Sequence, residues 1–281
     1  MAKQKAFERI FIIILENQLQ SAALDNGFMK SLASEGVRLS NYFGITHPSQ
    51  PNYIAAIAGL PFVTDDNPVN LPDTSIVDLL EAKNVTWKAY MEDLPENNKA
   101  VASKGLYFRK HNPFISFDRV RNDPQRLAKI VNAQQLAADV KKNDLPQFSW
   151  FTPNIQNDGH TPPANFEPNI PLRRVDFLAQ WLKSFLQPLR KKPNFAKGTL
   201  VVVIFDESVP HDENNVYAVL LGEMVKPNTV ESTRYDHYSL LRTVEENFGL
   251  GTLNRNDLAA DWFRFLWGEE PPAFNWAMHS Q

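Results

Sequence analysis

The sequence predicts an α/β fold with a mostly parallel central sheet and helices on both faces. Two short apolar runs without polar alternation, residues 10–15 and 199–205, are typical of strands buried on both faces. Helical patterns lie between the predicted strands, as in βαβ units. The chain has 281 residues, of which 43% are hydrophobic and 22% charged, and no linker divides it. We therefore interpret residues 1–281 as a single domain.

The remaining elements follow in order along the chain. Further strands are predicted at residues 87–91, 148–152 and 216–221. Helices are predicted at residues 76–82, 127–140, 174–187 and 238–248. Pro188 is expected to stop the third of these helices, and Gly249 to cap the fourth. An additional helix is expected to begin after Asn52, where a run of small residues follows a proline-flanked loop.

Two proline-rich loops and an aromatic C-terminal segment have two interpretations each. Residues 60–73 and 161–171 are either surface connections or the walls of a substrate cleft. The C-terminal segment contains Trp262, Phe263, Phe265, Trp267, Phe274 and Trp276. We expect it to dock onto the core, and a homodimer contact remains the alternative.

Composition excludes several classes of protein. The net charge of −3 and the pI near 6.1 give no basic field for nucleic acid. The chain has no cysteine, which excludes disulfides, thiolate catalysis and cysteine-ligated zinc. It has no apolar run of transmembrane length and no apolar signal segment. We expect a cytoplasmic protein, or a secreted one from which a signal peptide has been removed.

Ser49 lies in a stiff segment between Pro48 and Pro51. Proline fixes its own φ and disfavours the helical region for the residue before it. One interpretation is a turn with a capping serine. The other is a covalent nucleophile at the mouth of a helix, where the helix N-terminus favours an anion.

Acidic and amide side chains follow the predicted buried strands. Glu16 and Asn17 follow the first, and Asp206 and Glu207 follow the strand at residues 199–205. Because ligands bind beyond the carboxyl ends of such strands, these side chains should converge on one crevice. The carboxylates would repel one another unless protons or a cation neutralised them. Their oxygens suit Mg²⁺, Mn²⁺ or Ca²⁺ as ligands, with Zn²⁺ and iron not excluded. Each pair, taken alone, is equally consistent with a helix cap or a polar turn.

Four histidines are candidates for the same crevice. His47 is close to Ser49 in sequence, His160 follows the Asp158-Gly159 turn, and His237 lies at a predicted helix start. His111 is either a substrate contact or a structural histidine, and we favour the structural role.

Several segments together resemble a known family. Leu15-Glu16-Asn17 and residues 47–53, 110–114, 205–207 and 235–239 look like the phosphoesterase family of acid phosphatases and non-haemolytic phospholipases C. That family belongs to the alkaline-phosphatase-like superfamily, and among its branches the chain is most similar to the small acid phosphatases. The motifs are spread over most of the chain, so the resemblance implies an alkaline-phosphatase-like fold.

The resemblance also implies roles for individual residues. Ser49 would be the nucleophile and a metal ligand. His160 and His237 would be catalytic, contacting phosphate or a second metal. Many superfamily members have Asp-His at the Asp206-Glu207 position, so the site could hold one divalent ion or two. The implied metal ligands are Glu16, Asn17, Ser49, Asp206 and Glu207, and the candidates for substrate contact are Asn52, His47, His111 and Asp158.

We therefore predict metal-dependent hydrolysis of small phosphate monoesters through a phosphoserine at Ser49. A phosphodiesterase or phospholipase C on the same metal site is the alternative, and a non-catalytic phosphate- or metal-binding module is another. A metal-independent Ser-His-Asp hydrolase is less consistent, because Ser49 lacks the flanking glycines of a nucleophile elbow. Sulfatase chemistry is disfavoured, since the expected arginine does not follow Ser49.

Overall fold

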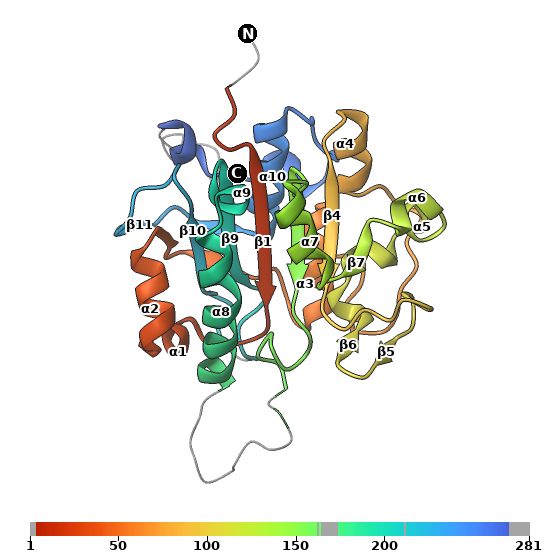
Figure 1. Ribbon diagram of the computed structural model, residues 1–281, viewed down its shortest axis with the longest axis horizontal. Coiled ribbons are helices and arrows are strands. Elements are labelled where there is room, and N and C mark those ends of the chain that lie inside the picture. The colour runs from red at the N-terminus through yellow and green to blue at the C-terminus, as the bar shows by residue number, and fades with distance from the viewer. Residues whose placement is uncertain (1–3, 162, 164–173, 211, 270–281) are drawn as a thin grey trace, which may run out of the picture.

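An eight-stranded sheet runs through the centre of the computed structural model, which describes residues 4–161, 163, 174–210 and 212–269 (Figure 1). The strand order is β11-β2-β10-β9-β1-β8-β4-β7. β10 is antiparallel to both of its neighbours, and all other pairs are parallel. The prediction of a mostly parallel sheet is thus confirmed. The strands are β1 (Arg9–Leu15), β2 (Val37–Leu39), β4 (Trp87–Met91), β7 (Ile130–Asn132), β8 (Phe148–Thr152), β9 (Thr199–Phe205), β10 (Ala218–Leu221) and β11 (Thr229–Glu231).

Two small ribbons lie outside the main sheet. β3 (Tyr42–Phe43) pairs with β12 (Tyr235–Asp236), and β5 (Ser103–Lys104) pairs with β6 (Tyr107–Phe108). The first ribbon joins the segment before Ser49 to the segment before His237, which are far apart in the sequence.

Helices cover both faces of the sheet (Figure 1). On one face are α2 (Gly27–Ser34), α7 (Gln135–Lys142), α8 (Arg174–Arg190) and α9 (Pro193–Ala196); on the other are α3 (Ser49–Ala58), α10 (His237–Phe248) and η2 (Pro113–Ser116). The shorter or peripheral helices are α1 (Gln20–Asp25), α4 (Ile76–Ala82), α5 (Asp118–Arg121), α6 (Pro124–Leu127), α11 (Asn256–Ala259), η1 (Arg109–His111) and η3 (Arg264–Trp267).

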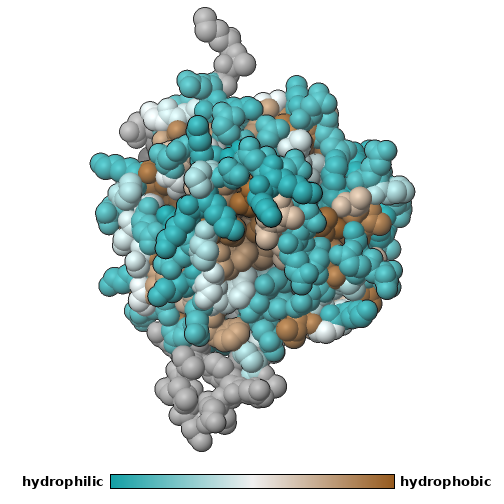
Figure 2. All heavy atoms as spheres, in the orientation of Figure 1, coloured by the Kyte–Doolittle hydropathy of each residue, from teal (hydrophilic) through white to brown (hydrophobic). Residues whose placement is uncertain are grey.

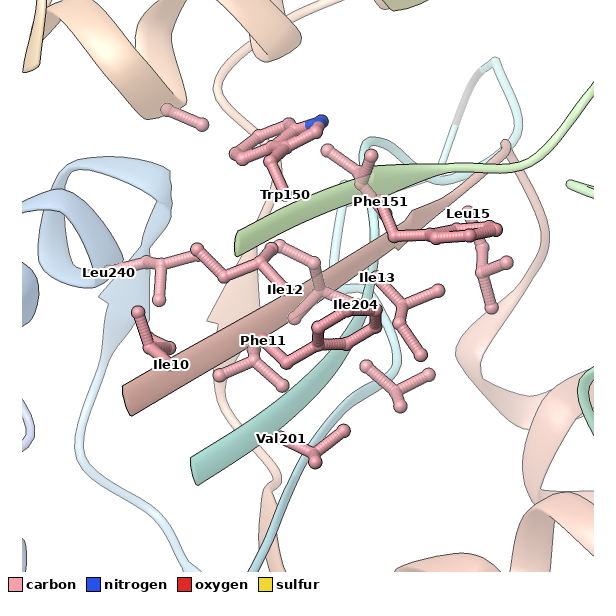
Figure 3. Packing of buried hydrophobic residues seen from close by; sticks show 14 of the residues in the cluster. Ile10, Phe11, Ile12, Ile13, Leu15, Trp150, Phe151, Val201, Ile204 and Leu240 are labelled. Carbon is pink, nitrogen blue, oxygen red and sulfur yellow. The ribbon is translucent and has the colours of Figure 1, made fainter. Parts of the chain in front are cut away.

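Figure 3 shows buried side chains of β1, β8 and β9 packed together in the core. Aromatic contacts connect this core to both helix layers. Phe11 of β1 packs on Phe195 of α9, with ring centroids 5.0 Å apart. Trp150 of β8 packs in the opposite direction, on Phe114 of η2 at 5.7 Å and Tyr53 of α3 at 6.5 Å. Successive strand residues point to opposite faces, so a continuous apolar run supplies the core on both sides.

Two predicted helices differ in the structure. Residues 127–140 were expected to form one helix, but Ile130 and Val131 lie in the edge strand β7, paired with β4, and α7 begins only at Gln135. Such β-branched residues favour a pleated strand. Pro188 does not stop α8, which continues to Arg190. In the last turn, a proline removes only one helical hydrogen bond.

The helix expected after Asn52 begins earlier, at Ser49, with Pro48 as its N-cap. Pro51 therefore lies in the first turn, where its missing N–H would have had no helical partner. Ser49 is a helical residue rather than part of an extended loop.

The C-terminal aromatic segment docks onto the core as far as the structure describes it. Trp262 and Phe263 are buried, and Phe265 and Trp267 pack against the same core. Phe274 and Trp276 lie outside the described residues, as does most of the predicted loop at residues 161–171. A homodimer stays a prediction.

The view in Figure 2 shows a surface that is mostly hydrophilic, with apolar residues scattered over it. Among the described residues, no helix has both the length and the apolar character needed to cross a bilayer.

Candidate active site

Three acidic side chains lie at the carboxyl ends of three adjacent strands. Glu16 directly follows β1, Asp206 follows β9, and Asp158 lies in the turn after β8. Backbone hydrogen bonds between the strands extend to these residues. Glu16 N donates to Asp158 O at 2.9 Å, and Asp206 N donates to Leu15 O at 2.9 Å. All three residues are fully buried. The structure thus brings Glu16 and Asp206 together, as expected from the sequence, and adds Asp158 beside them.

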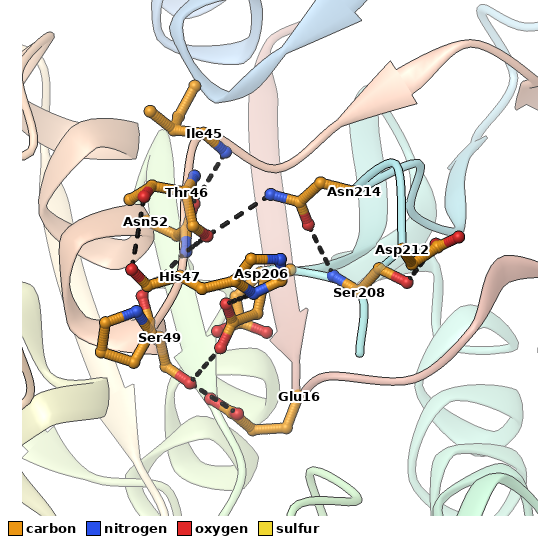
Figure 4. A network of polar contacts seen from close by, with 12 residues as sticks. Glu16, Ile45, Thr46, His47, Ser49, Asn52, Asp206, Ser208, Asp212 and Asn214 are labelled. Atoms are coloured by element: carbon orange, nitrogen blue, oxygen red, sulfur yellow. Dashed lines mark hydrogen bonds and ion pairs between the residues drawn. The ribbon is translucent and has the colours of Figure 1, made fainter. Parts of the chain in front are cut away.

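Ser49 faces the carboxylates from the first turn of α3 (Figure 4). Its Oγ lies 3.0 Å from Glu16 Oε2 and 3.0 Å from Glu207 Oε1, and its exposure is 2%. A hydroxyl has one proton to donate, so one of the two carboxyl groups must donate to it. Glu207 is suited to that role, because burial and then the charge of Glu16 raise its pKa to about 8.

His111 links two of the acidic residues. Its Nε2 lies 2.8 Å from Glu16 Oε1 and its Nδ1 3.2 Å from Asp158 Oδ2, and its ring stacks on Tyr53. Burial opposes protonation, but Glu16 and Asp158 outweigh it and raise the His111 pKa to about 9. Burial raises the pKa of Asp158 to about 7 despite the His111 charge. Although burial opposes it, the His111 charge lowers the pKa of Glu16. Tyr53 OH donates a further hydrogen bond to Glu16 Oε1 at 3.0 Å.

Buried oxygens without partners indicate room for a cation. Neither carboxylate oxygen of Asp206 nor Oδ1 of Asn17 has a hydrogen-bond partner among the described residues. Burial and then the neighbouring Glu16 raise the Asp206 pKa well above its usual range, so this arrangement needs positive charge or protons. Carboxylate and amide oxygens suit a hard divalent ion. Ligand atoms of Glu16, His111 and Asp158 also lie within 4.8 Å of one another, close enough to hold an ion together.

The Asn52 side chain, in α3, forms hydrogen bonds with the backbone of the turn that precedes Ser49. Its Oδ1 accepts hydrogen bonds from Ile45 N at 2.7 Å and Thr46 N at 3.1 Å. Its Nδ2 donates to Thr46 O at 2.8 Å and Pro48 O at 3.1 Å. Both N–H groups of the amide are therefore engaged, and a contact of Asn52 with substrate stays a prediction.

The other predicted histidines lie around this centre in different ways. His47 Nδ1 forms an ion pair or hydrogen bond with Glu207 Oε2. His237 is fully buried behind Asp206, where its Nε2 donates to the Asp206 carbonyl at 2.5 Å and its Nδ1 accepts from Tyr42 OH at 3.1 Å. Burial lowers the pKa of His237, which keeps it neutral. Its catalytic role stays a prediction, and the observed contacts position Asp206.

His160 is half-buried next to the acidic centre. Its Nδ1 lies 3.0 Å from Thr161 Oγ1, and its Nε2 lies 3.5 Å from Lys110 Nζ. Burial is the main factor that lowers the His160 pKa, and the positive charge of Lys110 adds to it. A neutral imidazole with one unprotonated nitrogen is able to accept a proton.

Sequence reasoning did not identify Tyr53, Lys110 or Asp66 as part of this centre. Tyr53 and Lys110 belong to segments that carried the family resemblance, so a signal for them was present. Asp66 had no signal beyond its place in a proline-rich loop.

A family model described as the Phosphoesterase family matches residues 17–251. The chain belongs to this family. It is 39% identical over 268 residues to a "Probable acid phosphatase" of Kluyveromyces lactis, covering 90% of this chain and 61% of the relative. It is 35% identical to an "Acid phosphatase" of Aspergillus fumigatus, covering 91% of this chain and 58% of the relative. The chain thus spans about three fifths of the length of these curated relatives.

Among solved structures, the fold resembles a protein in the alkaline phosphatase superfamily from Vibrio parahaemolyticus. The TM-score is 0.60 at 13% identity, with 92% of this chain and 71% of the other covered. This likeness concerns the fold alone, and it confirms the predicted alkaline-phosphatase-like architecture.

Proposed function

We propose that this member of the Phosphoesterase family hydrolyses phosphate monoesters, with Ser49 as the nucleophile. One observation supports the proposal most directly. The Ser49 hydroxyl is buried between Glu16 and Glu207, 3.0 Å from an oxygen of each. It lies beside the Asp206 carboxylate, whose oxygens have no hydrogen-bond partner in the part of the chain that the structure describes. The family's acid phosphatase relatives agree with this chemistry.

The donor set fits a divalent metal ion. Glu16, Asn17, Asp206 and Glu207 would hold it next to Ser49, and His111 with Asp158 would hold a second ion if one binds. When bound, a metal ion would lower the pKa of the serine hydroxyl and polarise a phosphoryl oxygen. The candidate ions are Mg²⁺, Mn²⁺, Ca²⁺, Zn²⁺ and iron.

The proposed reaction takes place in two displacements on phosphorus. Ser49 Oγ forms a bond to phosphorus as the bond to the alcohol oxygen breaks. The serine proton passes to the Glu16 carboxylate, to which Ser49 donates, and the leaving alcohol oxygen takes a proton from solvent. Water then attacks the phosphoserine as the bond between Oγ and phosphorus breaks. The water proton passes to His160, Oγ takes back the proton held by Glu16, and inorganic phosphate is released. His160 is the proposed base for that water, because it is neutral and borders the acidic centre.

The other site residues would hold the acidic side chains and the Ser49 turn in position. His237 holds the Asp206 backbone, His47 pairs with Glu207, and Asn52 fixes the turn that presents Ser49. Accurate placement of the nucleophile changes the rate by orders of magnitude. These contacts would therefore affect the rate although they do not touch the reacting atoms.

The test is Ser49→Ala, with Ser31→Ala on the exposed surface of α2 as a matched control. We expect Ser49→Ala to lose turnover of an aryl phosphate by at least about 10³-fold while keeping the wild-type thermal transition. Acid quenching during turnover, followed by peptide mass spectrometry, should find phosphate on Ser49 in the wild type. Retention of most of the activity in Ser49→Ala with metal present would reject Ser49 as the nucleophile.

A further inference from the structure

A lysine and an aspartate pair next to the proposed nucleophile without a part in the reaction described above. Lys110 lies in η1, and its side chain is 14% exposed. Its Nζ donates to Asp66 Oδ2 at 2.8 Å and lies 3.5 Å from His160 Nε2. A lysine ammonium is charged at neutral pH, so this group adds positive charge at the edge of an acidic site.

Asp66 connects that ammonium group to the first turn of α3. Its Oδ1 accepts a hydrogen bond at 3.0 Å from the backbone N of Gln50, the residue after Ser49. One carboxylate therefore contacts both the lysine and an amide at the helix N-terminus. The Asp66 carboxylate is stabilised there, because the Gln50 amide has no helical partner and lies at the positive end of the helix dipole.

The loop that carries Asp66 is fixed at several points. The buried Gln50 side chain donates from Nε2 to Asp65 O at 3.0 Å and Asn67 O at 2.7 Å. The buried Arg109 donates from Nη2 to Val69 O at 2.6 Å and Asn70 Oδ1 at 2.7 Å. The loop is thus held by one residue beside Ser49 and by another beside Lys110. These contacts support the interpretation of this loop as a wall of the site.

The Lys110 charge reaches the reaction centre. It interacts electrostatically with Glu16, Asp206 and Glu207. In a half-buried site such interactions are screened much less than in water. An incoming phosphoryl group at Ser49 would therefore be attracted by Lys110 in proportion to its own charge.

Because the attraction by Lys110 depends on the charge of the phosphoryl group, it distinguishes two classes of phosphate ester. A monoester carries close to two negative charges above a pH of about 6, whereas a diester carries one. We propose that Lys110 selects dianionic phosphate monoesters over monoanionic diesters, and that Asp66 is the positioning residue that holds its ammonium group beside Ser49. The inference rests on the proposed phosphoesterase function and deepens it, since it concerns which esters the site prefers.

The decisive measurement compares Lys110→Met with the wild type on an aryl phosphate and a bis-aryl phosphate at pH 7. We expect kcat/KM for the monoester to fall about 10²-fold and that for the diester about 10-fold, because the lost attraction is proportional to the charge of the ester. Lys110→Arg should retain most of the wild-type preference. An equal fall for both esters, or no fall for the monoester, would overturn the proposal. If Lys110→Met does not fold, the comparison is made with Lys110→Gln.

Asp66 is tested through the same ratio. Asp66→Asn keeps an acceptor for Gln50 N but removes the charge that holds Lys110, so the monoester-to-diester ratio should fall through a higher monoester KM. Asp65→Asn is the control, because Asp65 is exposed on the same loop and its carboxylate accepts a local hydrogen bond from Asn67 N, two residues away. An Asp66→Asn enzyme with the wild-type ratio would remove Asp66 from the proposal.

A binding measurement keeps the two proposals distinguishable. Calorimetric titration with inorganic phosphate needs no turnover, and Lys110→Met should bind phosphate at least about 10-fold more weakly than the wild type. A wild type that binds phosphate in a Lys110-dependent way but hydrolyses neither ester would reject the proposed function and support the lysine's role. An active wild type with unchanged phosphate affinity in Lys110→Met would reject the lysine's role alone.

Discussion

Replacing Asn52 by alanine is expected to destabilise the protein and to slow any reaction at Ser49. The Asn52 side chain is completely buried and makes four hydrogen bonds to the backbone of the turn that precedes Ser49. Alanine would leave the N–H groups of Ile45 and Thr46 and the carbonyls of Thr46 and Pro48 without these bonds. The turn that presents the nucleophile would then lose its main side-chain support.

The magnitude follows from those four bonds. Each is worth about 1 kcal/mol net, which gives about 4 kcal/mol for the set. Thr46 O also accepts from Asn214 Nδ2 at 3.4 Å, so part of one interaction survives. Alanine's better helix propensity returns about 0.5 kcal/mol. The free energy of unfolding should therefore fall by about 3 kcal/mol, and misplacement of Ser49 should lower kcat about 10²-fold.

Urea unfolding followed by circular dichroism measures the first quantity, and turnover of an aryl phosphate measures the second. Asn67→Ala, at an exposed position of the neighbouring loop, is the control and should change neither. A loss below about 1 kcal/mol together with an unchanged kcat would show that the turn does not depend on Asn52.

Two further predictions concern protons and metal. Burial, and then the neighbouring Asp257, raise the pKa of Glu245 to about 9 from 4.5. The folded state therefore binds this proton more tightly than the unfolded state, and stability should fall as pH rises from about 4.5 to about 9. Glu245→Gln should flatten that fall when unfolding free energies are compared at pH 5 and pH 8, whereas equal slopes for both proteins would contradict the assignment. Prolonged dialysis against a chelator should abolish ester hydrolysis and lower Tm, with both restored by a divalent ion, because an ion bound only by the folded state stabilises it. Full activity in protein shown by elemental analysis to be metal-free would exclude the metal-dependent reaction.

Local sequence signals predicted much of the sheet. The apolar run of β9 (Thr199–Phe205) has the predicted bounds, as do β4 (Trp87–Met91) and β8 (Phe148–Thr152), because burial on both faces selects continuous apolar residues. β7 was missed, since Ile130 and Val131 stand between helical patterns and take strand geometry only through pairing with β4. The start of α3 was placed too late because proline was given weight as a helix breaker, although the first turn accepts it.

Only part of the site was predictable from the sequence, because several of its contacts depend on how separate elements pack together. Glu16 and Asp206 follow strands, so topology alone brings them together. The position of His111 between Glu16 and Asp158 depends on how η1 packs against two strand ends, and no local pattern encodes that contact. Similarly, no local pattern indicated that the Asn52 amide bonds to the backbone of the turn before Ser49.

The pairing of β1 with β9 has a consequence for how the site comes into existence. These strands are distant in sequence: Arg9 and Thr199, which are paired at one end of the ladder, are 190 positions apart. Closing so large a loop has a high entropic cost, and folds dominated by such contacts fold slowly. Because Leu15 pairs with Phe205, Glu16 and Asp206 meet only when this ladder is complete. During refolding, the appearance of metal affinity should therefore report a late, long-range step, well after the local helices have formed.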